Sequence, residues 1–345
     1  MGAVGNPVAD FVDSLDLDAH VVGGAVRDEL LGLPGKDLDF VVPGVGHAEL
    51  RTALAPHGRL EDLVVGEQLV GVRLHPRDAT LRAAQPAGLE FAPPRRERST
   101  GPGRHDFEIV ADAAITLEED MRRRDFTINA IARSLRTGEI LDPLGGRADL
   151  EARILRTTTA TSFRDDPLRI VRGLRFVSEL GLDADADTVR QMREWGPQLE
   201  HVSGERIGGG LAADGMGELS KLLLGRRPAV ALRLARDTGA LVRVIPEFEP
   251  AIGYELPGDR QPVSLDEHVF AVVQGTADAR AGLAVRLAAL LHDLGKPVTD
   301  RSGAGGHAAS GGELALAVLG RLRYPTRLRE RVGRLVAGHG YRLDG

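Results

Sequence analysis

Two aspartates separated by one residue offer the first chemistry in this sequence. Asp37 and Asp39 lie in the segment Asp37–Val42, which reads DLDFVV and predicts a β-strand, and a strand places residues i and i+2 on the same face. Neighbouring carboxylates repel each other unless a cation lies between them. Because Mg²⁺ prefers oxygen ligands and often takes one or two carboxylates plus substrate phosphates, the pair predicts a Mg²⁺ site. A solvated strand edge is the alternative for an isolated D-x-D pair.

A double glycine precedes this strand. Gly23 and Gly24 follow a short apolar run and lead into a short predicted helix that carries Arg27. Glycine backbone N–H groups let a phosphate approach closely, and a guanidinium offers a fork for phosphate oxygens. The sequence lacks the G-x-x-x-x-G-K-[ST] pattern, so this is not a P-loop. The order of strand, glycine pair, helix with arginine and D-x-D strand indicates a nucleotide site.

This order resembles the signature of the nucleotidyltransferase superfamily that includes CCA-adding tRNA nucleotidyltransferases and bacterial poly(A) polymerases. The segment Arg123–Ala130, RRDFTINA, is similar to the second motif of that family without a gap. The resemblance implies that Arg123 and Arg124 hold a triphosphate. Asp125 and Asn129 beside them suit the triphosphate and sugar edge, although Asp125 could instead pair with an arginine.

The resemblance also implies a third carboxylate on a neighbouring strand. The segment Gly88–Ala92 reads as a strand in which Glu90 alternates with Leu89 and Phe91, so its side chain faces away from theirs. Glu90 is therefore expected to complete the catalytic carboxylates. An exposed strand glutamate is the alternative.

A second motif lies on a predicted helix over 162–180. Asp166 lies one turn before Arg169, and Arg172 and Arg175 continue the same stripe, which is typical of a salt-bridged helix face. The resemblance to the family's E-D-x-x-R motif implies instead that Asp166 and Arg169 select cytosine or adenine, with Arg172 and Arg175 in support. Both bases present an amine donor beside a ring-nitrogen acceptor, which one carboxylate and one guanidinium can satisfy.

The C-terminal part contains His292-Asp293 together with His268, His307 and His339, a pattern that resembles the HD phosphohydrolase domain. Imidazole and carboxylate together suit a divalent metal, so these five residues predict a metal site. Histidines packed in a helical core are the alternative. The HD pattern also needs a distal aspartate, and no convincing one precedes the C-terminus, which predicts an incomplete ligand set.

The sequence predicts an α+β nucleotidyltransferase head with a short mixed sheet over 1–157, an all-helical neck over 158–227 and a helical HD-type body over 228–345. Helices are expected over 7–18, 47–56 and 117–133. Strands are expected over 58–75. The segment 93–105, rich in proline, glycine and arginine, is expected to form a mobile loop.

Composition narrows the class of partners. The net charge is −6, which argues against a protein coated in nucleic acid, and aromatic content of 4% leaves few platforms for base stacking. The sequence contains no cysteine and no apolar run long enough to span a membrane. We therefore expect a cytoplasmic protein that binds neither membrane nor DNA.

The resemblance implies template-independent, Mg²⁺-dependent transfer of CMP and AMP from CTP and ATP to the 3′ end of tRNA. Two alternatives stay open at this point. The first is a relative with narrower output: a poly(A) polymerase, or an enzyme that adds only CC or only A. The second is an HD phosphohydrolase whose head binds a nucleotide without transferring it.

Overall fold

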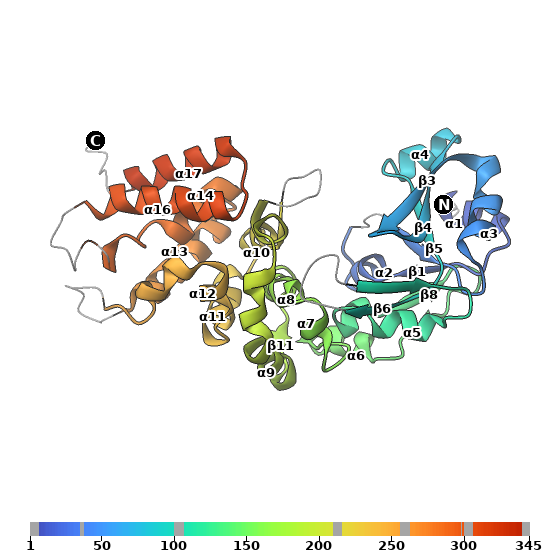
Figure 1. Cartoon of the computed structure of the whole chain (residues 1–345), viewed down its shortest axis with the longest axis horizontal. Coiled ribbons are helices and arrows are strands. Elements are labelled where there is room, and N and C mark those ends of the chain that lie inside the picture. Colours follow the sequence, from blue (N-terminus) through green and yellow to red (C-terminus); the bar gives the residue numbers. More distant parts are fainter. Residues whose placement is uncertain are drawn as a thin grey trace. The chain divides into compact units, whose positions relative to one another are not determined.

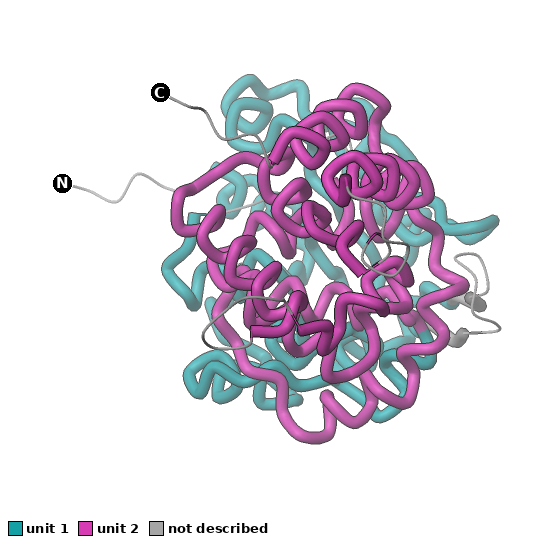
Figure 2. Tube along the Cα trace, turned by 90° about the vertical axis from the view of Figure 1, so that its left-hand side faces the viewer, with its two compact units in different colours: residues 1–165 teal, residues 166–345 magenta. Residues whose placement is uncertain are grey.

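The computed structural model describes residues 7–34, 38–99, 107–209, 216–255, 263–297, 299 and 306–339. The chain folds into two compact units, Met1–Asp165 and Asp166–Gly345 (Figure 2). The first unit is a mixed α+β head and the second is helical (Figure 1), so the predicted fold class is confirmed. Among the described residues, none of the helices combines the length and apolar character needed to cross a membrane.

A seven-stranded sheet forms the framework of unit 1, with strand order β3-β4-β5-β2-β1-β8-β9. Strands β2 and β5 run parallel, whereas the other neighbours pair antiparallel. The strands are β1 His20–Val22, β2 Asp39–Val41, β3 Gly58–Val65, β4 Gln68–Pro76, β5 Leu89–Ala92, β8 Ala132–Ser134 and β9 Ile140–Leu141. The expected strands over 58–75 are β3 and β4.

The central strands have two different faces because their side chains alternate. On one face, the rings of Phe40 and Phe91 stack with centroids 4.9 Å apart. On the other face, Val41 joins a buried cluster with Val22 of β1 and Met121 of α5 (Leu117–Arg122). Asp39 shares that second face with Val41 but is exposed. The sheet therefore separates an aromatic core from the face that carries the acidic side chains.

The other elements of unit 1 are α1 Pro7–Ser14, α2 Gly24–Leu30, α3 His47–Leu54, a 3-10 turn Ala55–His57, α4 Ala79–Ala84, β6 Arg95–Ser99, β7 Phe107–Ala111, α5 Leu117–Arg122, a 3-10 turn Thr127–Asn129, α6 Gly146–Glu151, β10 Ile154–Leu155 and α7 Ser162–Asp165.

Two expectations for unit 1 were wrong. The segment predicted as a mobile loop contains β6, which pairs antiparallel with β7; residues 100–106 lie outside the described part. The helix predicted over 117–133 ends at Arg122. It ends there because the Asp125 side chain accepts hydrogen bonds from the Phe126 amide and from Asn129 Nδ2, at 2.9 and 2.8 Å. Such local side-chain bonds compete with helix formation.

Unit 2 is built almost entirely from helices. They are α8 Leu168–Leu180, α9 Ala186–Trp195, α10 Glu218–Leu224, α11 Pro228–Asp237, α12 Ala240–Val244, α13 Leu265–Asp278, α14 Leu283–Leu291, α16 His307–Arg321 and α17 Thr326–Gly338. Shorter pieces are strand β11 Asp183–Ala184, 3-10 turns Gly196–His201 and Pro246–Ala251, and a π-helix Glu205–Gly209. Helix α17 packs against both α14 and α16.

Candidate active site and metal cluster

Three carboxylates of unit 1, on strands β2, β5 and β3, lie in a row across the sheet. Asp39 of β2 and Glu90 of β5 are register partners on neighbouring parallel strands, and Glu90 is in turn the partner of Arg73 on β4. Glu61 of β3 completes the row opposite Arg73. Since register partners point to the same face, Asp39 and Glu90 project side by side. Asp37 lies outside the described residues, so its predicted place in this row stays a prediction.

Arg73 is the cation of this row. Its Nε donates a hydrogen bond to Glu90 Oε1 over 3.0 Å, its Nη2 contacts the same oxygen, and its Nη1 lies 3.2 Å from Glu61 Oε1. The hydrogen bond to Glu90 raises the pKa of Arg73, with Asp39 adding to the effect. Arg73 was not among the predicted site residues, although it is the one charged side chain in the apolar run Leu69–Leu74.

The donor set of the row suits a hard divalent ion. Asp39 and Glu90 offer only carboxylate oxygens, Asp39 is exposed and the Glu90 side chain is 36% exposed, so water and phosphate oxygens can complete the coordination. Arg73 occupies one oxygen of Glu90 and leaves the other for an ion. These residues therefore fit a Mg²⁺-type ion.

The glycine turn is closely packed by an arginine. Gly23 has φ +71°, and a Cβ at this position would lie 2.7 Å from Arg124 Nη1. The positive φ favours glycine, and a side chain at this position would also displace the Arg124 guanidinium. Arg124 Nε is buried without a hydrogen-bond partner, which is the type of donor that an anionic ligand can satisfy. The two motifs that the sequence analysis singled out therefore meet at Gly23.

Asp120 contacts both Arg123 and Arg124 and is fully buried. Asp120 Oδ1 accepts from Arg123 over 2.8 Å and Oδ2 accepts from Arg124 over 3.1 Å. Burial alone would raise the pKa of Asp120, but the charges of the two arginines hold it below the ordinary value. Burial lowers the pKa of Arg124, while Asp120 acts in the opposite direction. Asp120 thereby holds the two guanidinium groups next to each other.

Arg27 serves as a buried connection between the two motifs. It is 5% exposed, and its Nη1 donates to Asn129 Oδ1 over 2.6 Å while its Nη2 donates to Asp28 Oδ1 over 2.6 Å. Asn129 in turn donates to Asp125 Oδ1 over 2.8 Å. Of the predicted phosphate ligands in unit 1, Arg123 and Arg124 are more accessible than Arg27, with side chains that are 16% and 17% exposed.

The motif predicted to read the base lies in unit 2. Asp166 accepts the Leu168 amide over 3.1 Å at the start of α8, and its Oδ2 lies 2.9 Å from Arg206 Nη2. The Arg169 amide donates to the carbonyl of Asp166 over 3.0 Å. Arg206 was not predicted as a partner of Asp166, because the two residues are far apart in the chain.

The other two arginines of α8 contact one carboxylate. Arg172 Nη1 lies 3.6 Å and Arg175 Nε 3.2 Å from the carboxylate oxygens of Glu218, on α10. The Glu218 side chain is 10% exposed. Both arginines therefore link α8 to α10 by ion pairs, and their predicted support of base selection stays a prediction.

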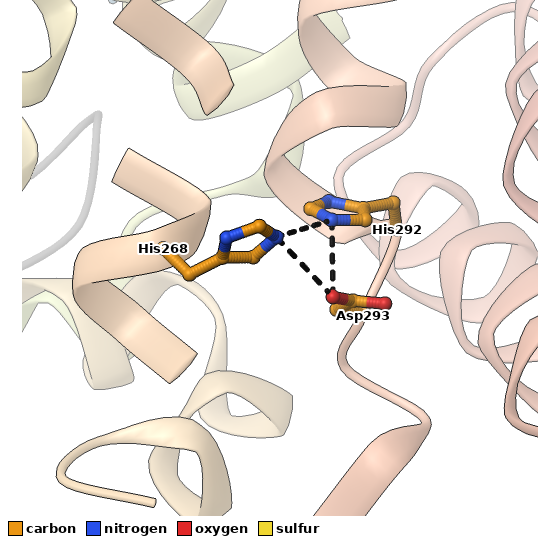
Figure 3. Close-up of side chains that lie close together, drawn as sticks. All are labelled: His268, His292 and Asp293. Carbon is orange, nitrogen blue, oxygen red and sulfur yellow. Dashed lines mark hydrogen bonds and ion pairs between the residues drawn. The ribbon is translucent and has the colours of Figure 1, made fainter. Parts of the chain in front are cut away.

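The five residues of the HD pattern converge on one carboxylate. His268 lies on α13, His292 and Asp293 follow α14, His307 begins α16, and His339 follows α17. Figure 3 shows the rings of His268 and His292 turned toward Asp293, which is 2% exposed. Their Nε2 atoms lie 3.6 and 3.1 Å from Asp293 Oδ2.

The other oxygen of Asp293 faces the remaining two histidines. His339 Nε2 lies 3.2 Å and His307 Nε2 4.0 Å from Oδ1. Lys296 Nζ, which the sequence analysis missed, lies 2.7 Å from Oδ2. Burial alone would raise the pKa of Asp293, but His292 and Lys296 hold it well below the usual range. A divalent ion fits this set of imidazoles around a buried carboxylate.

Comparisons with known proteins match three consecutive parts of the chain to family models. Residues 19–156 match the model of the poly A polymerase head domain, residues 181–252 that of the probable RNA and SrmB-binding site of polymerase A, and residues 265–345 that of the HD domain. A protein of Aromatoleum aromaticum named multifunctional CCA protein is 38% identical over 332 residues, which cover 93% of this chain and 74% of the relative. The relative of the same name from Pseudomonas aeruginosa is also 38% identical, with 93% and 73% covered.

The chain belongs to the family of CCA-adding tRNA nucleotidyltransferases and bacterial poly(A) polymerases. The crystal structure of the Bacillus stearothermophilus CCA-adding enzyme in complex with CTP is 26% identical, with a TM-score of 0.61 over 96% of this chain and 68% of that chain. The Thermotoga maritima CCA-adding enzyme complexed with tRNA has the same fold, with 22% identity and a TM-score of 0.58 over 96% and 77% of the two chains. Enzymes of the nucleotidyltransferase and HD families use divalent metals.

Proposed function

We propose that this chain completes the CCA end of tRNA by adding CMP and AMP from CTP and ATP. The observation that carries the proposal is the pairing of Asp39 with Glu90 on neighbouring strands. The same unit holds the Arg124 guanidinium against the Gly23 turn. The relatives that share 38% identity over most of their length are named for CCA synthesis, which supports this substrate.

The residues of unit 1 divide the work of transfer between them. Asp39 and Glu90, together with Asp37, would hold Mg²⁺, which when bound supplies a lowered pKa for the attacking 3′-hydroxyl and charge stabilisation for pyrophosphate. Gly23 and Gly24 would let the triphosphate approach the backbone next to Arg124.

The segment Arg123–Ala130 would contact both the triphosphate and the sugar of the nucleotide. Arg123 and Arg124 would neutralise the triphosphate from the platform that Asp120 provides. Arg27 donates to Asn129, which in turn donates to Asp125, and these hydrogen bonds would keep the sugar edge of the site rigid. Rigid placement of reacting groups is a large part of enzymatic rate enhancement.

Base selection is assigned to α8. Asp166 and Arg169 would pair with the amine and ring nitrogen of cytosine or adenine, and Arg172 and Arg175 would keep the helix in place through Glu218. Arg206 holds Asp166 in position by a 2.9 Å ion pair. The protein, and no template strand, would then choose the base.

The tRNA would bind through its phosphates to local basic surface, because the chain as a whole carries a net charge of −6. Affinity should fall as salt rises. A tRNA substrate would place the enzyme in the cytoplasm. The five HD residues would hold a divalent metal in addition to the Mg²⁺ of the head.

A single incorporation assay tests this function. The purified protein is given tRNA that ends before CCA, with Mg²⁺ and with CTP, ATP, UTP or GTP separately and then with CTP and ATP together. We expect CMP to be added first and AMP only after it, with no incorporation of UMP or GMP. Long A tails would instead indicate a poly(A) polymerase, and extension by only one nucleotide type would indicate a partial enzyme. No incorporation at all would leave the HD phosphohydrolase alternative.

A further inference from the structure

One arginine of unit 1 is shared between two carboxylates. Arg73 on β4 is the register partner of Glu61 on β3 and of Glu90 on β5, so the three side chains lie side by side on one face of the sheet. Arg73 Nη1 lies 3.2 Å from Glu61 Oε1, whereas Nε, over 3.0 Å, and Nη2 both donate to Glu90 Oε1. The guanidinium is thereby divided between Glu90, a ligand of the proposed ion site, and Glu61, a carboxylate that the proposed reaction does not use.

This division decides how many oxygens of Glu90 are available to an ion. A guanidinium that faces a single carboxylate often pairs with it through two parallel hydrogen bonds, one to each oxygen. Arg73 does not pair with Glu90 in this way, because both of its contacts go to Oε1, and Oε2 accepts no hydrogen bond from the described residues. The contact of Nη1 with Glu61 holds the third nitrogen of the guanidinium. It therefore opposes the rotation that would bring a nitrogen to Oε2.

A histidine fixes Glu61 in turn. Glu61 Oε2 lies 2.9 Å from Nε2 of His75, which follows Arg73 by two residues on the same face of β4. Since a carboxylate only accepts, Nε2 of His75 carries a proton. The hydrogen bond from His75 lowers the pKa of Glu61, and the charges of Arg73 and Arg59 act in the same direction. Glu61 is therefore ionised at neutral pH and stays paired with Arg73.

A divalent ion needs Glu90 to be only partly paired. Asp39, the register partner of Glu90 on β2, brings a second carboxylate to the same face, and carboxylate oxygens are the ligands that Mg²⁺ prefers. A guanidinium paired with both oxygens of Glu90 would compete with the ion for them. In the observed arrangement Arg73 pairs with Oε1 alone, so Oε2 is available to the ion.

We propose that Glu61 is a positioning residue for the ion site of the head: by pairing with Arg73, it keeps the guanidinium on one oxygen of Glu90 and leaves the other oxygen to the divalent ion. Glu61 acts through Arg73 and contacts neither the ion nor the substrate. Loss of the Glu61 charge lets Arg73 pair with both oxygens of Glu90, which weakens metal binding. This inference rests on the proposed ion site at Asp39 and Glu90 and adds what sets its affinity.

Metal binding measured without turnover tests the proposal. The full-length protein is titrated with Mn²⁺, which shares the oxygen preference of Mg²⁺, and the free ion is followed by electron paramagnetic resonance. The variants are Glu61→Gln, Arg73→Gln and the double variant. Glu67→Gln is the matched control, because it removes the same charge from the exposed turn between β3 and β4. Only the sites that Asp39→Ala lacks are assigned to the head, since Mn²⁺ can also bind the HD cluster of His268, His292, Asp293, His307 and His339.

We expect Glu61→Gln to raise the Kd of the head for Mn²⁺ by about threefold and Glu67→Gln to leave it unchanged. Glu61→Gln should have no further effect once Arg73 is replaced, so the double variant should match Arg73→Gln. An equal rise in both backgrounds would overturn the proposal, because Glu61 would then act on the ion directly through its charge. An unchanged Kd in Glu61→Gln, or an equal rise in Glu67→Gln, would also overturn it.

The incorporation assay gives a second readout and separates this inference from the proposed function. In Glu61→Gln, the Mg²⁺ concentration for half-maximal rate should rise by the same factor as the Kd, while kcat at saturating Mg²⁺ stays at the wild-type level. A protein that binds Mn²⁺ at the head as expected but incorporates no nucleotide would contradict the proposed function and leave this inference intact. Equal Mn²⁺ binding by the wild type and Asp39→Ala would overturn the ion site and this inference with it.

Discussion

The head and the HD cluster each contain a carboxylate beside a cation of the protein itself, yet their surroundings differ. In the head, Arg73 contacts Glu90, and the neighbouring donor is the exposed carboxylate of Asp39. In the HD cluster, Lys296 contacts the buried Asp293, and the other donors are imidazoles. Oxygen donors open to water suit Mg²⁺, whereas nitrogen donors around a buried carboxylate suit transition metals. The two centres of one chain are therefore expected to prefer different metal ions because their donor atoms differ.

The largest expected effect separates the two centres. Asp39→Ala should lower kcat/KM for nucleotide addition by at least about a thousandfold, or about 4 kcal/mol, because a ligand of the catalytic ion is lost. Its Ni²⁺ content in the HD cluster should be unchanged. Incorporation assays and metal counting on the same preparations measure both quantities.

The control for this experiment is Asp13→Ala, an exposed aspartate on α1 of the same unit. It should leave both quantities at the wild-type level. Unchanged incorporation in Asp39→Ala would exclude transfer at this site. A parallel loss of Ni²⁺ would mean that the two centres are not independent.

A smaller effect is expected at the cation of the head. Arg73→Gln removes the group that orients Glu90, so kcat should fall by roughly tenfold. It also removes a positive charge next to the ion site, worth about 1 kcal/mol even at the dielectric constant of water. The Mg²⁺ concentration for half-maximal rate should therefore fall by about fivefold. A Mg²⁺ titration of the incorporation rate gives both values.

Arg82→Gln, an exposed arginine on α4, is the matched control for Arg73→Gln. It should change neither kcat nor the Mg²⁺ dependence. If Arg73→Gln behaves like this control, Arg73 is only a structural partner of the strands. If the Mg²⁺ requirement rises, orientation of Glu90 outweighs the charge.

The alternation and the motifs of the sequence predicted much of this arrangement. Glu90 was predicted to face away from Leu89 and Phe91, and both are fully buried while Glu90 is not. Strand alternation is a local property, so one strand is enough to predict it. The five residues of the HD pattern were chosen from their residue types and order, and the structure brings them together around Asp293; that they bind a metal stays a prediction.

Contacts between side chains that are far apart in the sequence could not be predicted from it. Arg73 meets Glu90 only because β4 lies beside β5, and Arg206 meets Asp166 across 40 residues of chain. Neither contact leaves a local pattern. The early end of α5 also depends on distant chain, since the Asp125 carbonyl accepts the Thr158 amide over 3.3 Å. Propensity is overridden where tertiary hydrogen bonds compete with the helix.

The last prediction concerns the stability of the head and not its activity. It tests Asp120, a buried carboxylate whose two oxygens accept from Arg123 and Arg124. The folded pKa of Asp120 is lowered, so its contribution to stability is present above the unfolded pKa of about 3.9 and is lost as the pH falls through the folded value. Asp120→Asn should therefore lower the unfolding free energy of the head by about 3 kcal/mol at pH 7, because two arginines lose their partner. The difference from wild type should shrink below about pH 4.

The measurement has to report on unit 1, because the single tryptophan, Trp195, lies on α9 of unit 2. The unfolding free energy of the head is measured by pulsed hydrogen exchange of peptides from 117–134 along a urea gradient, at pH 7 and at pH 3. Glu118→Gln is the matched control, because its ion pair with Arg122 on the same helix is exposed and worth at most about 0.5 kcal/mol. A loss in Asp120→Asn no larger than in this control would mean that Asp120 does not hold the arginines. An equal loss at both pH values would mean that packing, and not charge, sets the effect. Either outcome would contradict the comparison in which Asp120 is neutralised by arginines whereas Asp293 is available to a metal ion.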